Sequence, residues 1–320
     1  MEIKNICDND LDKYDELAEK YGTIFDRYNW LRLFNNILIF GIYDEGNNLI
    51  GGFHLYKEKR FAIKIYRNAP FTPYNGPFIK NDAKLPVRIA NKNREILLLI
   101  SEYFDKIKYS VISVSLGRNI NDTMPFIWRK YKVAPRYTYI IDLNNSIEQI
   151  YNNISSEKRN HIIKAKSDNA EVRQVFNYNI VKALVLKTFS RQKVKINEKY
   201  LDKILFEFAN KKNSFAFATY VEEQPVSAAF YIFDATTAYC LLSGYDHGKK
   251  HRGAGVLEKW EAIKYSKDRG LKYFDFEGSM IPGIEEFFRS FGGILTPYFR
   301  INKAFLPLEI ALKLFNRELF

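Results

Sequence analysis

The chain has 320 residues, of which 47% are apolar and 16% aromatic, a composition that excludes a disordered protein and favours two domains or one large α/β unit. Its net charge of +12 at pH 7 favours anionic partners such as phosphates, nucleotides, nucleic acid or an anionic membrane surface, although we expect most of the dispersed lysines to solvate helix faces. With two cysteines, four histidines without metal-ligand spacing and no signal-peptide pattern at its acidic start, the chain is expected to be cytoplasmic, without disulfides or a metal.

The first half of the chain predicts a three-stranded meander followed by a helix and a strand. Residues 36–66 contain three strand-like runs, NILIFGIYD, LIGGFHLYK and RFAIKIYR, with the turn EGNN between the first two, which is typical of antiparallel strands. Residues 88–107 carry apolar side chains at helical spacing, and the run YSVISVSLG that follows reads as a strand. The segment MPFIWRKYKVAPRYTYIID then predicts a short helix, a turn and a final strand.

The second half repeats this order of elements. Residues 213–246 predict a meander, VLEKWEAIKYSKDRG a helix, KYFDFEGS a strand, and IEEFFRSFGGILTPYFRIN a short helix, a turn and a strand. Phe40 and Phe53 lie 177 positions before Phe217 and Phe230. Chance similarity among aromatic strands is the alternative, but agreement in the order of five elements favours a tandem duplication. We therefore predict domains at 1–145 and 146–320, with a linking helix at about 146–168.

The turn HGKKHRGAG, residues 247–255, is the strongest candidate for a binding site. It opens the helix after the second meander, where the first free N–H groups of the helix and the close backbone approach that glycine allows favour a pyrophosphate. Its phosphate contacts are expected from Lys250, Arg252, Gly253, Ala254 and Gly255. A β-branched residue at position 253 is expected to abolish donor binding while leaving the fold largely intact.

Lys250-x-x-Gly253-x-Gly255 resembles the (Gln/Arg)-x-x-Gly-x-(Gly/Ala) acyl-CoA loop of the GNAT N-acyltransferase superfamily, and the duplicated chain resembles the Fem-like acyltransferase group within it. The resemblance covers residues 30–302. It implies an α+β fold of two tandem GNAT-like domains, each with a mixed, mostly antiparallel sheet flanked by helices, and direct acyl transfer from acyl-CoA, with acetyl-CoA favoured. The first domain has no Gly-x-Gly before its helix, so its donor site is expected to be degenerate.

The closing motif departs from the Fem-type pattern. Phe288-Arg289 stands before Phe291-Gly292-Gly293, where those enzymes typically carry Phe-Lys. Arginine does not deprotonate, although it binds a carboxylate or phosphate bidentately, so we expect Phe288 and Arg289 to contribute to substrate binding. This difference, and the lack of an inserted coiled-coil arm, favour acyl-CoA over aminoacyl-tRNA as the donor.

Catalysis of acyl transfer to an amine requires a group that accepts the amine proton. Glu277, at the end of the strand KYFDFEG, is the first candidate, and Asp275 lies on the same face of that strand. Asp246 and Tyr245 precede the pyrophosphate turn and are the next candidates. A strand-end cap or an ion pair is an equally weighted alternative for each carboxylate.

The acceptor side is expected in the first domain. Tyr74 and Asn75 lie in the rigid loop PFTPYNGP and are predicted to line it, with a purely structural turn as the alternative. Lys158 and Arg159 of the linking helix would steer an anionic acceptor, although a solvated helix face is the commoner explanation. The C-terminal stretch AFLPLEIALKLFNRELF is amphipathic and either packs on its domain, which we favour, or rests on a membrane.

Taken together, these features predict an N-acyltransferase acting on an amino sugar or peptide, nucleotide-linked or lipid-linked, in cell-envelope or surface-polysaccharide synthesis. A location in the cytoplasm, with peripheral contact at the inner face of the membrane, is consistent with such an acceptor. Two alternatives stay open. One is a Fem-type enzyme that uses aminoacyl-tRNA to modify a peptidoglycan precursor, and the other is a non-catalytic module that binds a nucleotide or a sugar.

Overall fold

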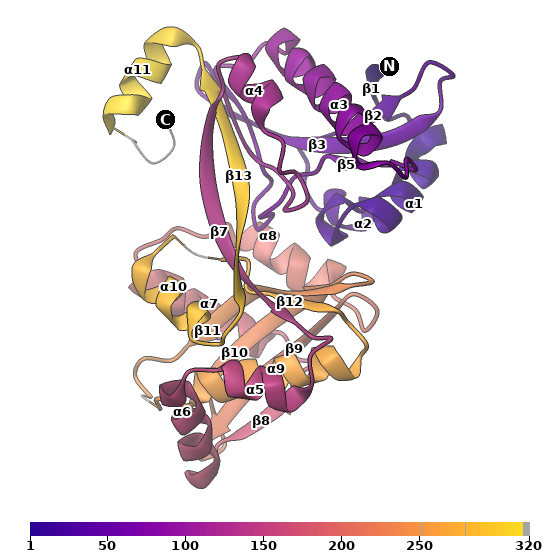
Figure 1. Cartoon of the computed structure of the whole chain (residues 1–320). Coiled ribbons are helices and arrows are strands. Elements are labelled where there is room, and N and C mark those ends of the chain that lie inside the picture. The colour runs from indigo at the N-terminus through magenta and orange to yellow at the C-terminus, as the bar shows by residue number, and fades with distance from the viewer. Residues whose placement is uncertain (250, 279, 316–320) are drawn as a thin grey trace. The chain divides into compact units, whose positions relative to one another are not determined.

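The computed structural model describes residues 1–249, 251–278 and 280–315 (Figure 1). The chain divides into two compact units, of which the first comprises Met1–Arg136 and Pro297–Phe320 and the second Tyr137–Thr296. Among the described residues no helix is long and apolar enough to cross a membrane.

The first unit contains a sheet in the order β1-β2-β3-β4-β6-β13, with β5 paired to β3. Among the described strands of this unit only β4 and β6 pair in parallel. Its strands are β1 (Glu2–Asn5), β2 (Ile37–Tyr43), β3 (Leu49–Arg60), β4 (Ile63–Arg67), β5 (Phe78–Ile79), β6 (Val111–Ser115) and part of β13 (Ile294–Ala304). Its helices are α1 (Leu11–Tyr21), α2 (Tyr28–Leu31), α3 (Pro86–Lys106), α4 (Met124–Trp128) and α11 (Leu306–Phe315).

The second unit has a sheet in the order β7-β12-β11-β10-β9-β8, and among its described strand pairs only β11 and β12 run parallel. Its strands are part of β7 (Lys132–Asp142), then β8 (Glu171–Gln174), β9 (Ser214–Val221), β10 (Gln224–Phe233), β11 (Thr237–Tyr245) and β12 (Tyr273–Asp275). Its helices are α5 (Ile147–Asn153), α6 (Ser156–Ser167), α7 (Asn179–Arg191), α8 (Glu198–Asp202), a π-helical turn (Lys203–Phe208), α9 (Ala254–Asp268) and α10 (Pro282–Arg289).

The predicted α+β fold with a repeated order of elements is confirmed. In each unit a short strand and two helices precede the meander, and a longer helix then leads to a strand parallel to the last meander strand. The leading elements, β1, α1 and α2 in the first unit and β8, α7 and α8 in the second, were missed in the sequence. The strands β1 and β8 are only four residues long, so they carry little alternation.

The linking segment forms two helices instead of the single predicted one. Ile154 leaves the helical conformation, and Ser155 then caps α6 by accepting a hydrogen bond from the backbone N–H of Lys158 at 3.4 Å. Ser146 caps α5 in the same way from Gln149. A serine at a helix start satisfies one of the free N–H groups there, so the two serines define two starts.

The boundary between the units also differs from the expected division at residue 145. Residues Arg300–Ala304 of β13 pair with β6 and complete the sheet of the first unit, whereas Ile140–Asp142 of β7 pair with β12 and complete the sheet of the second. Each repeat thus supplies its last strand to the other unit. A division by sequence order assigns residues 297–320 to the second domain because hydrophobic patterning carries no information on strand partners.

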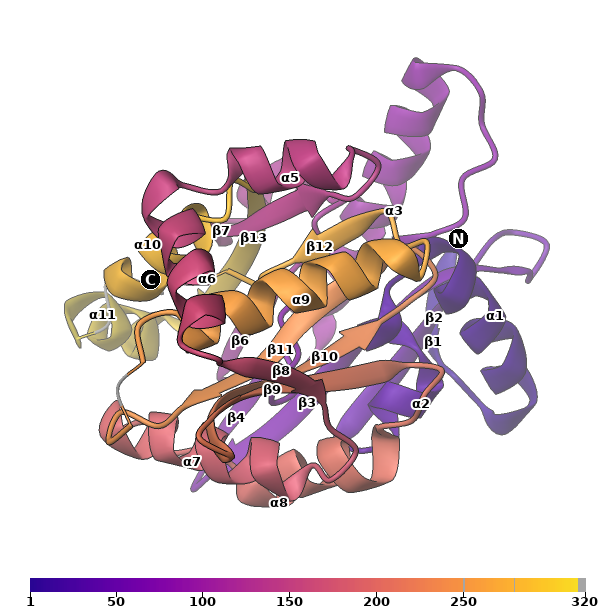
Figure 2. The same cartoon turned by 90° about the horizontal axis from the view of Figure 1, so that it is seen from below.

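Aromatic side chains build the core of each unit. In the second unit Phe215 and Tyr231 stack with ring centroids 4.9 Å apart, and Trp260 of α9 belongs to the same buried cluster. Figure 2 shows α5, α6 and α9 over one face of this sheet and α7 and α8 over the other. In the first unit α3 packs on Phe40 and Phe53, which stack at 4.9 Å.

Candidate active site

The parallel pairing of β11 and β12 stops halfway along β11. The register runs from Thr237 opposite Tyr273 to Tyr239 opposite Asp275, and β12 ends there while β11 continues to Tyr245. On its other side β11 stays paired with β10 but contains a β-bulge, because Cys240 and Leu241 lie opposite the single residue Tyr231. Bulges of this kind bend a strand and are frequent beside active sites. We refer to the region where the two strands part as the β11–β12 opening.

Tyr245 and Asp246 hold the connection between β11 and α9. The hydroxyl of Tyr245 accepts a hydrogen bond from the backbone N–H of His251 at 2.7 Å and donates to its carbonyl oxygen at 2.9 Å. Asp246 accepts from the N–H of Gly248 at 3.0 Å and from Lys187 Nζ at 2.7 Å. The Lys187 ammonium lowers the pKa of Asp246. These contacts match the alternative of a strand-end cap and ion pair, and they leave the base role to other groups.

The two glycines of the turn have different surroundings. A Cβ atom added to Gly253 would lie 2.3 Å from the carbonyl oxygen of His161 and 2.7 Å from Cβ of Ala165, both on α6. A Cβ atom added to Gly255 would meet no atom within 4 Å. Gly253 is therefore required for α6 and α9 to pack, and the expectation that it can be replaced with the fold intact is wrong. Gly255 is the position at which a ligand can approach the backbone.

The start of α9 offers N–H groups in a positively charged environment. The first N–H groups of a helix have no acceptor within the helix. Of these, the N–H of Ala254 donates to the carbonyl oxygen of His251 at 3.2 Å, and those of Gly255 and Val256 have no acceptor among the described residues. Arg252 is exposed, and Lys250 lies outside the described residues. Burial lowers the pKa of His161 of α6, and the charges of Lys158 and Arg252 lower it further. The second unit thus presents free N–H groups and cations together, as an anion requires.

Lys158 and Arg159 have separate roles. Arg159 donates to the carbonyl oxygens of Asn152 at 2.7 Å and Ile154 at 2.6 Å, so it caps the C-terminus of α5. Lys158 pairs with Glu157 at 3.1 Å and lies over the ring of Phe287 at 5.7 Å. Beyond the effect of burial, the charge of Lys158 lowers the pKa of His161.

Glu277 follows β12 in a turn that the surrounding backbone holds tightly. Its φ is +58° and that of Gly278 is +69°, and a Cβ atom at Gly278 would lie 2.0 Å from the carbonyl oxygen of Tyr137, so only glycine fits there. Asp275 accepts hydrogen bonds from Thr138 Oγ1 at 2.6 Å and from the N–H of Glu277 at 2.8 Å. Asp275 therefore positions Glu277. Left-handed backbone at a bulky residue is costly and is concentrated at functional sites.

The side chain of Glu277 is the strongest base candidate. Its Oε1 atom is buried and has no hydrogen-bond partner among the described residues, although the residue as a whole is half-buried. Burial raises the pKa of Glu277 well above its usual value, and the neighbouring charge of Asp275 raises it further. Buried carboxyls without partners are costly and need an explanation, and a raised pKa is the property that a general base near neutral pH requires.

A buried charged pair lies under the β11–β12 opening and was missed in the sequence. Lys259 of α9 contacts Glu258 at 2.7 Å, and Glu258 accepts a hydrogen bond from Tyr231 at 2.6 Å. Burial raises the pKa of the Cys240 thiol, Lys259 lowers it in part, and Glu277 is among the groups that raise it further. The sequence signal for this pair is that Glu258 and Lys259 are consecutive charged residues between the apolar positions of α9, a helix that is buried on almost every side.

The two predicted residues of the closing motif, Phe288 and Arg289, contact side chains near them in the second unit. Phe288 is buried and stacks on Phe276 with centroids 4.9 Å apart, so it belongs to the core. Arg289 is 60% exposed and contacts Glu285 at 3.0 Å, one helical turn away. Glu285 also accepts a hydrogen bond from Tyr139. Of this predicted pair, only the guanidinium of Arg289 is exposed enough to reach a substrate.

Tyr74 and Asn75 lie inside the first unit. Tyr74 is 1% exposed and contacts Tyr298 edge to face with centroids 5.1 Å apart. Asn75 is equally buried, its backbone N–H donates to the carbonyl oxygen of Ser115 at 3.0 Å, and its side-chain amide has no partner among the described residues. This placement matches the structural alternative for the loop, because neither side chain lines a surface.

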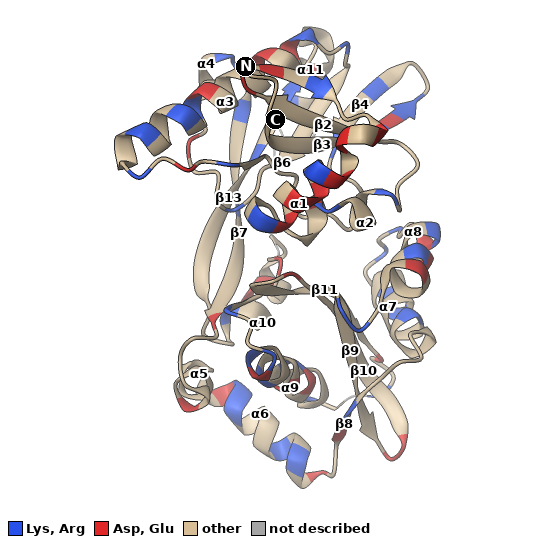
Figure 3. Cartoon of the chain, turned by 90° about the vertical axis from the view of Figure 1, so that its right-hand side faces the viewer, with Lys and Arg blue, Asp and Glu red and all other residues tan. Residues whose placement is uncertain are grey.

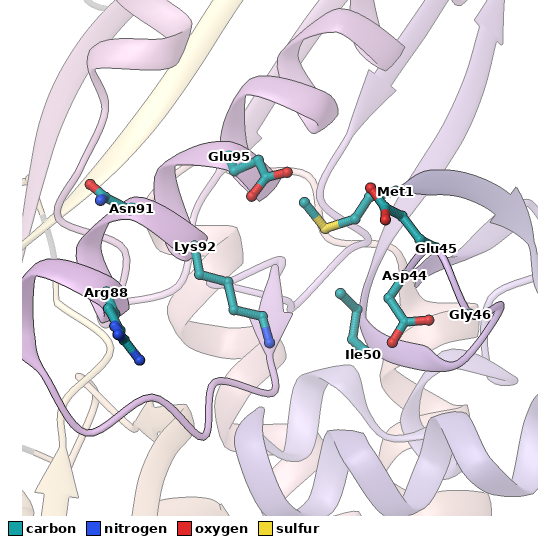
Figure 4. A pocket seen from close by; sticks show the side chains of 9 residues that line it. All are labelled: Met1, Asp44, Glu45, Gly46, Ile50, Arg88, Asn91, Lys92 and Glu95. Atoms are coloured by element: carbon teal, nitrogen blue, oxygen red, sulfur yellow. The ribbon is translucent and has the colours of Figure 1, made fainter.

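The first unit instead contains a cavity of about 550 Å³ elsewhere (Figure 4). Arg88 and Lys92 of α3 lie on one side, and Asp44 in the β2–β3 turn lies on the other. Hydrogen bonds from Asn48 lower the pKa of Asp44, and the charge of Lys92 contributes. The cavity is also lined by Met1, Glu45, Gly46, Ile50, Asn91 and Glu95. Its mixed charges offer no net field for an anion.

Residues 165–289 match the family model described as acetyltransferase (GNAT) domain. The matched range runs from α6 through α10 and includes the α9 turn and Glu277. This part of the chain is a GNAT domain. A sequence comparison with curated proteins finds no match. Among the described residues no cluster of three or more histidine, cysteine or carboxylate side chains is arranged to hold a metal.

Solved structures share the fold over nearly the whole chain. FemX has a TM-score of 0.71 and 12% sequence identity, covering 98% of this chain and 99% of that one. The C-terminal domain of a putative lysylphosphatidylglycerol synthetase from Agrobacterium fabrum has a TM-score of 0.58 and 10% identity, covering 95% of each chain. A tandem GNAT protein from the clavulanic acid biosynthesis pathway has a TM-score of 0.53 and 9% identity, covering 95% and 98%. The predicted likeness to Fem-like tandem GNAT proteins is thus confirmed for the fold.

Proposed function

We propose that the protein is an N-acyltransferase that transfers an acyl group, in the first instance acetyl, from acyl-CoA to an amine. The observation that carries this proposal is the position of Glu277. Glu277 stands just after the end of β12, beside the β11–β12 opening, and its buried Oε1 atom has no hydrogen-bond partner among the described residues. The GNAT match of this segment supports the reaction class.

The residues at the start of α9 fit a pyrophosphate. Among the described residues the N–H groups of Gly255 and Val256 have no acceptor, the backbone at Gly255 is open, and the exposed Arg252 adds a positive charge. A helix N-terminus is favourable for a phosphate because its N–H groups and its dipole act in the same direction. The backbone of Gly253 packs closely against His161 and Ala165 of α6, which fixes where this helix start lies.

The bound donor supplies a thioester, and the amine nitrogen of the acceptor attacks its carbonyl carbon. In the transfer the new N–C bond forms, the C–S bond breaks, the thiolate leaves as free coenzyme A, and the amine proton passes to the carboxylate of Glu277. Asp275 keeps Glu277 in place through the turn, and the β-bulge at Cys240 and Leu241 sets the course of the strand beside it. Ionised Glu277 is the active form, so its raised pKa makes the rate increase with pH.

The acceptor class rests on fold-level likeness. FemX and the putative lysylphosphatidylglycerol synthetase share the fold, which supports an amine-bearing sugar, peptide or lipid-linked acceptor of the cell envelope. Exposed Arg289 is available for an anionic group of that acceptor. A transferase that takes its acyl group from aminoacyl-tRNA is the second candidate, and the net charge of +12 favours it.

A pair of matched glycine variants tests the donor site. Gly255 and Gly283 are each the second residue of a helix, and an added Cβ atom meets nothing within 4 Å at either position. Titration calorimetry with acetyl-CoA and coenzyme A is expected to show binding to wild type and to Gly283→Val. For Gly255→Val we expect binding at least tenfold weaker, because the new side chain occupies the approach of the phosphates.

The competing outcomes are separable. Equal donor affinity of both variants would place the donor elsewhere and contradict the site. If neither acetyl-CoA nor coenzyme A releases heat while tRNA binds with steep salt dependence, the aminoacyl-tRNA donor is correct. Binding of acetyl-CoA without coenzyme A release, across a panel of amino sugars and amine-bearing peptides, would indicate a non-catalytic module.

A further inference from the structure

One face of the sheet in the first unit carries arginines on neighbouring strands. Arg67 of β4 lies opposite Ser113 of β6, and Arg300 of β13 lies opposite Ser115 of β6. Residues that pair across a sheet share a face, and so do residues two apart on one strand. Both arginines are therefore on the face of Ser113 and Ser115. Figure 3, which draws Lys and Arg in blue, shows β6, β13 and β7 beside one another in this sheet.

Arg136, in the part of β7 that belongs to the first unit, is on the same face. Val133 of β7 and Ile301 of β13 both belong to the core that packs on α3. Because successive side chains of a strand point to opposite faces, Arg136 and Arg300 point away from that core. Burial lowers the pKa of Arg300, and the charge of Arg136 and then that of Arg67 lower it further. We call Arg67, Arg136 and Arg300 the arginine face, in which the positive charges act on one another.

The arginine face has less negative charge around it than its three guanidinium groups require. Arg67 contacts Glu58 at 2.7 Å, but Glu58 also pairs with Arg60 at 2.5 Å. Among the described residues neither Arg136 nor Arg300 has an ion-pair partner, and both side chains are partly buried. Like charges that are partly withdrawn from water and left unpaired are costly. A bound anion would offset this cost, so the arrangement indicates an anionic ligand.

Two buried donor atoms on this face have no acceptor among the described residues. One is Nε of Arg136. The other is Nδ2 of Asn302, a residue of β13 that is 1% exposed and whose Oδ1 accepts a hydrogen bond from the hydroxyl of Ser113 at 2.6 Å. Asn302 is two residues from Arg300, about 7 Å along the strand, and Nε of Arg300 donates to the hydroxyl of Ser115 at 3.0 Å. Both unpaired atoms are donors, so the missing partner is an acceptor, which an oxyanion supplies.

We propose that the arginine face, with Asn302 as a neutral donor, binds a phosphate group. Guanidinium groups bind phosphate and carboxylate oxygens in a fixed, bidentate geometry. A phosphate group carries about −1.5 to −2 charges at pH 7, which suits the two arginines without an ion-pair partner better than a single carboxylate does. The phosphate belongs either to a phosphorylated acceptor, in which case the inference deepens the proposed function and rests on it, or to a free phosphate ion.

Titration calorimetry without acyl-CoA tests the site, in the Gly255→Val variant so that the turn before α9 does not contribute. We expect glucosamine 1-phosphate to bind, and Arg300→Gln or Arg136→Gln added to this variant to weaken binding by about tenfold or more. Arg94→Gln is the matched control, because Arg94 of the same unit pairs with Asp122 at 2.7 Å, and it should bind like its parent. Succinate should bind more weakly, since its two charges lie on separate carboxylates.

Thermal unfolding separates a binding role from a structural one. In phosphate-free buffer Arg136→Gln should melt at or above the wild-type temperature, because it removes an uncompensated charge, and inorganic phosphate should raise the melting temperature of wild type but not of this variant.

The possible outcomes are distinct. Unchanged binding of glucosamine 1-phosphate in both arginine variants, equal loss in Arg94→Gln, or succinate binding as tight as that of the sugar phosphate overturns the proposal. Inorganic phosphate binding as tightly as glucosamine 1-phosphate supports the site with the free ion as its ligand. Coenzyme A should bind Arg300→Gln like wild type, so a failure of the arginine face and a failure of the donor site are told apart.

Discussion

The two units have the same order of elements but differ at the end of their parallel strand pair, which is open in the second unit and closed by hydrogen bonds in the first. In the second unit β11 and β12 part beyond Tyr239 and Asp275, and α9 then begins at an open glycine. In the first unit β4 and β6 are paired from Ile65 opposite Val111 to Arg67 opposite Ser113. Beyond this pair the side chain of Asn68 links the two strand ends, because it accepts a hydrogen bond from the backbone N–H of Ser115 at 2.8 Å.

The loop that follows β4 completes the closure in the first unit. The N–H of Asn75 donates to Ser115 at 3.0 Å, and the N–H of Gly117 donates to Gly76 at 2.8 Å. The place that would receive a donor is filled by the protein's own backbone. This supports the proposal that the donor site of the first unit is degenerate. The comparison shows that two units of the same topology need not share a site when the loop after one strand differs.

The largest effect is expected at Glu277. Glu277→Gln keeps the size of the side chain but removes its ability to accept a proton, so kcat should fall by about 10²- to 10⁴-fold while acetyl-CoA binding is retained. Coenzyme A release in a thiol assay measures this. Glu261→Gln is the control. Glu261 forms an ion pair with Lys264 on α9 itself, so this variant should retain activity. Wild-type turnover in Glu277→Gln would show that Glu277 is not the general base. The proposed functional difference between the second unit and the first would then lose its catalytic part.

Gly253 and Gly255 should separate folding from binding. Gly253→Val forces a side chain into the backbone of His161 and is expected to lower the free energy of unfolding by about 3 kcal/mol. Gly255→Val should change it by less than about 1 kcal/mol, since the position is open and valine and glycine differ little within a helix. Urea denaturation followed by circular dichroism measures both. Equal stability of the two variants would show that α6 does not require Gly253.

Asn68 tests the closure of the first unit. Asn68→Ala leaves the N–H of Ser115 without its acceptor, which should cost about 1–3 kcal/mol of unfolding free energy, whereas Asn179→Ala on the exposed start of α7 should cost little. Calorimetry should give one acetyl-CoA per chain for wild type and for Asn68→Ala. Two bound donors per wild-type chain would contradict the assignment of a degenerate first site.

The smallest effect concerns the pH dependence of stability. The folded-state pKa of Glu277 lies above that of the unfolded chain, about 4.3, because burial raises it. Between these two values the folded state holds a proton that the unfolded state has lost, so stability falls as pH rises through this window and levels off above the folded pKa. Glu277→Gln lacks this loss and should melt above wild type by a margin that grows with pH. A constant margin from pH 4 to 8 would mean that Glu277 is ionised in the folded protein.

Much of the architecture followed from local patterns. Apolar strand runs between turns, the apolar face of α3 and the glycine turn before α9 are properties of contiguous residues, and period and turn chemistry report them directly. The repeat was visible for the same reason, since both halves place these patterns in one order. The tandem GNAT-like fold and the position of Glu277 at a strand end could therefore be predicted from sequence.

Roles that depend on partners from distant parts of the chain were decided by tertiary structure. Whether Gly253 or Gly255 is open depends on α6, which lies about 90 residues earlier, and Tyr245 and Asp246 were candidate catalysts until their contacts with His251 and Lys187 assigned them to the turn. The exchange of β7 and β13 between the units depends on strand pairing. Sequence alone determined which local elements form and where the proposed anion-binding turn lies, because neighbours along the chain set backbone conformation. Burial, ion pairing and strand partners, which decide what each side chain can do, are set by residues that only folding brings together.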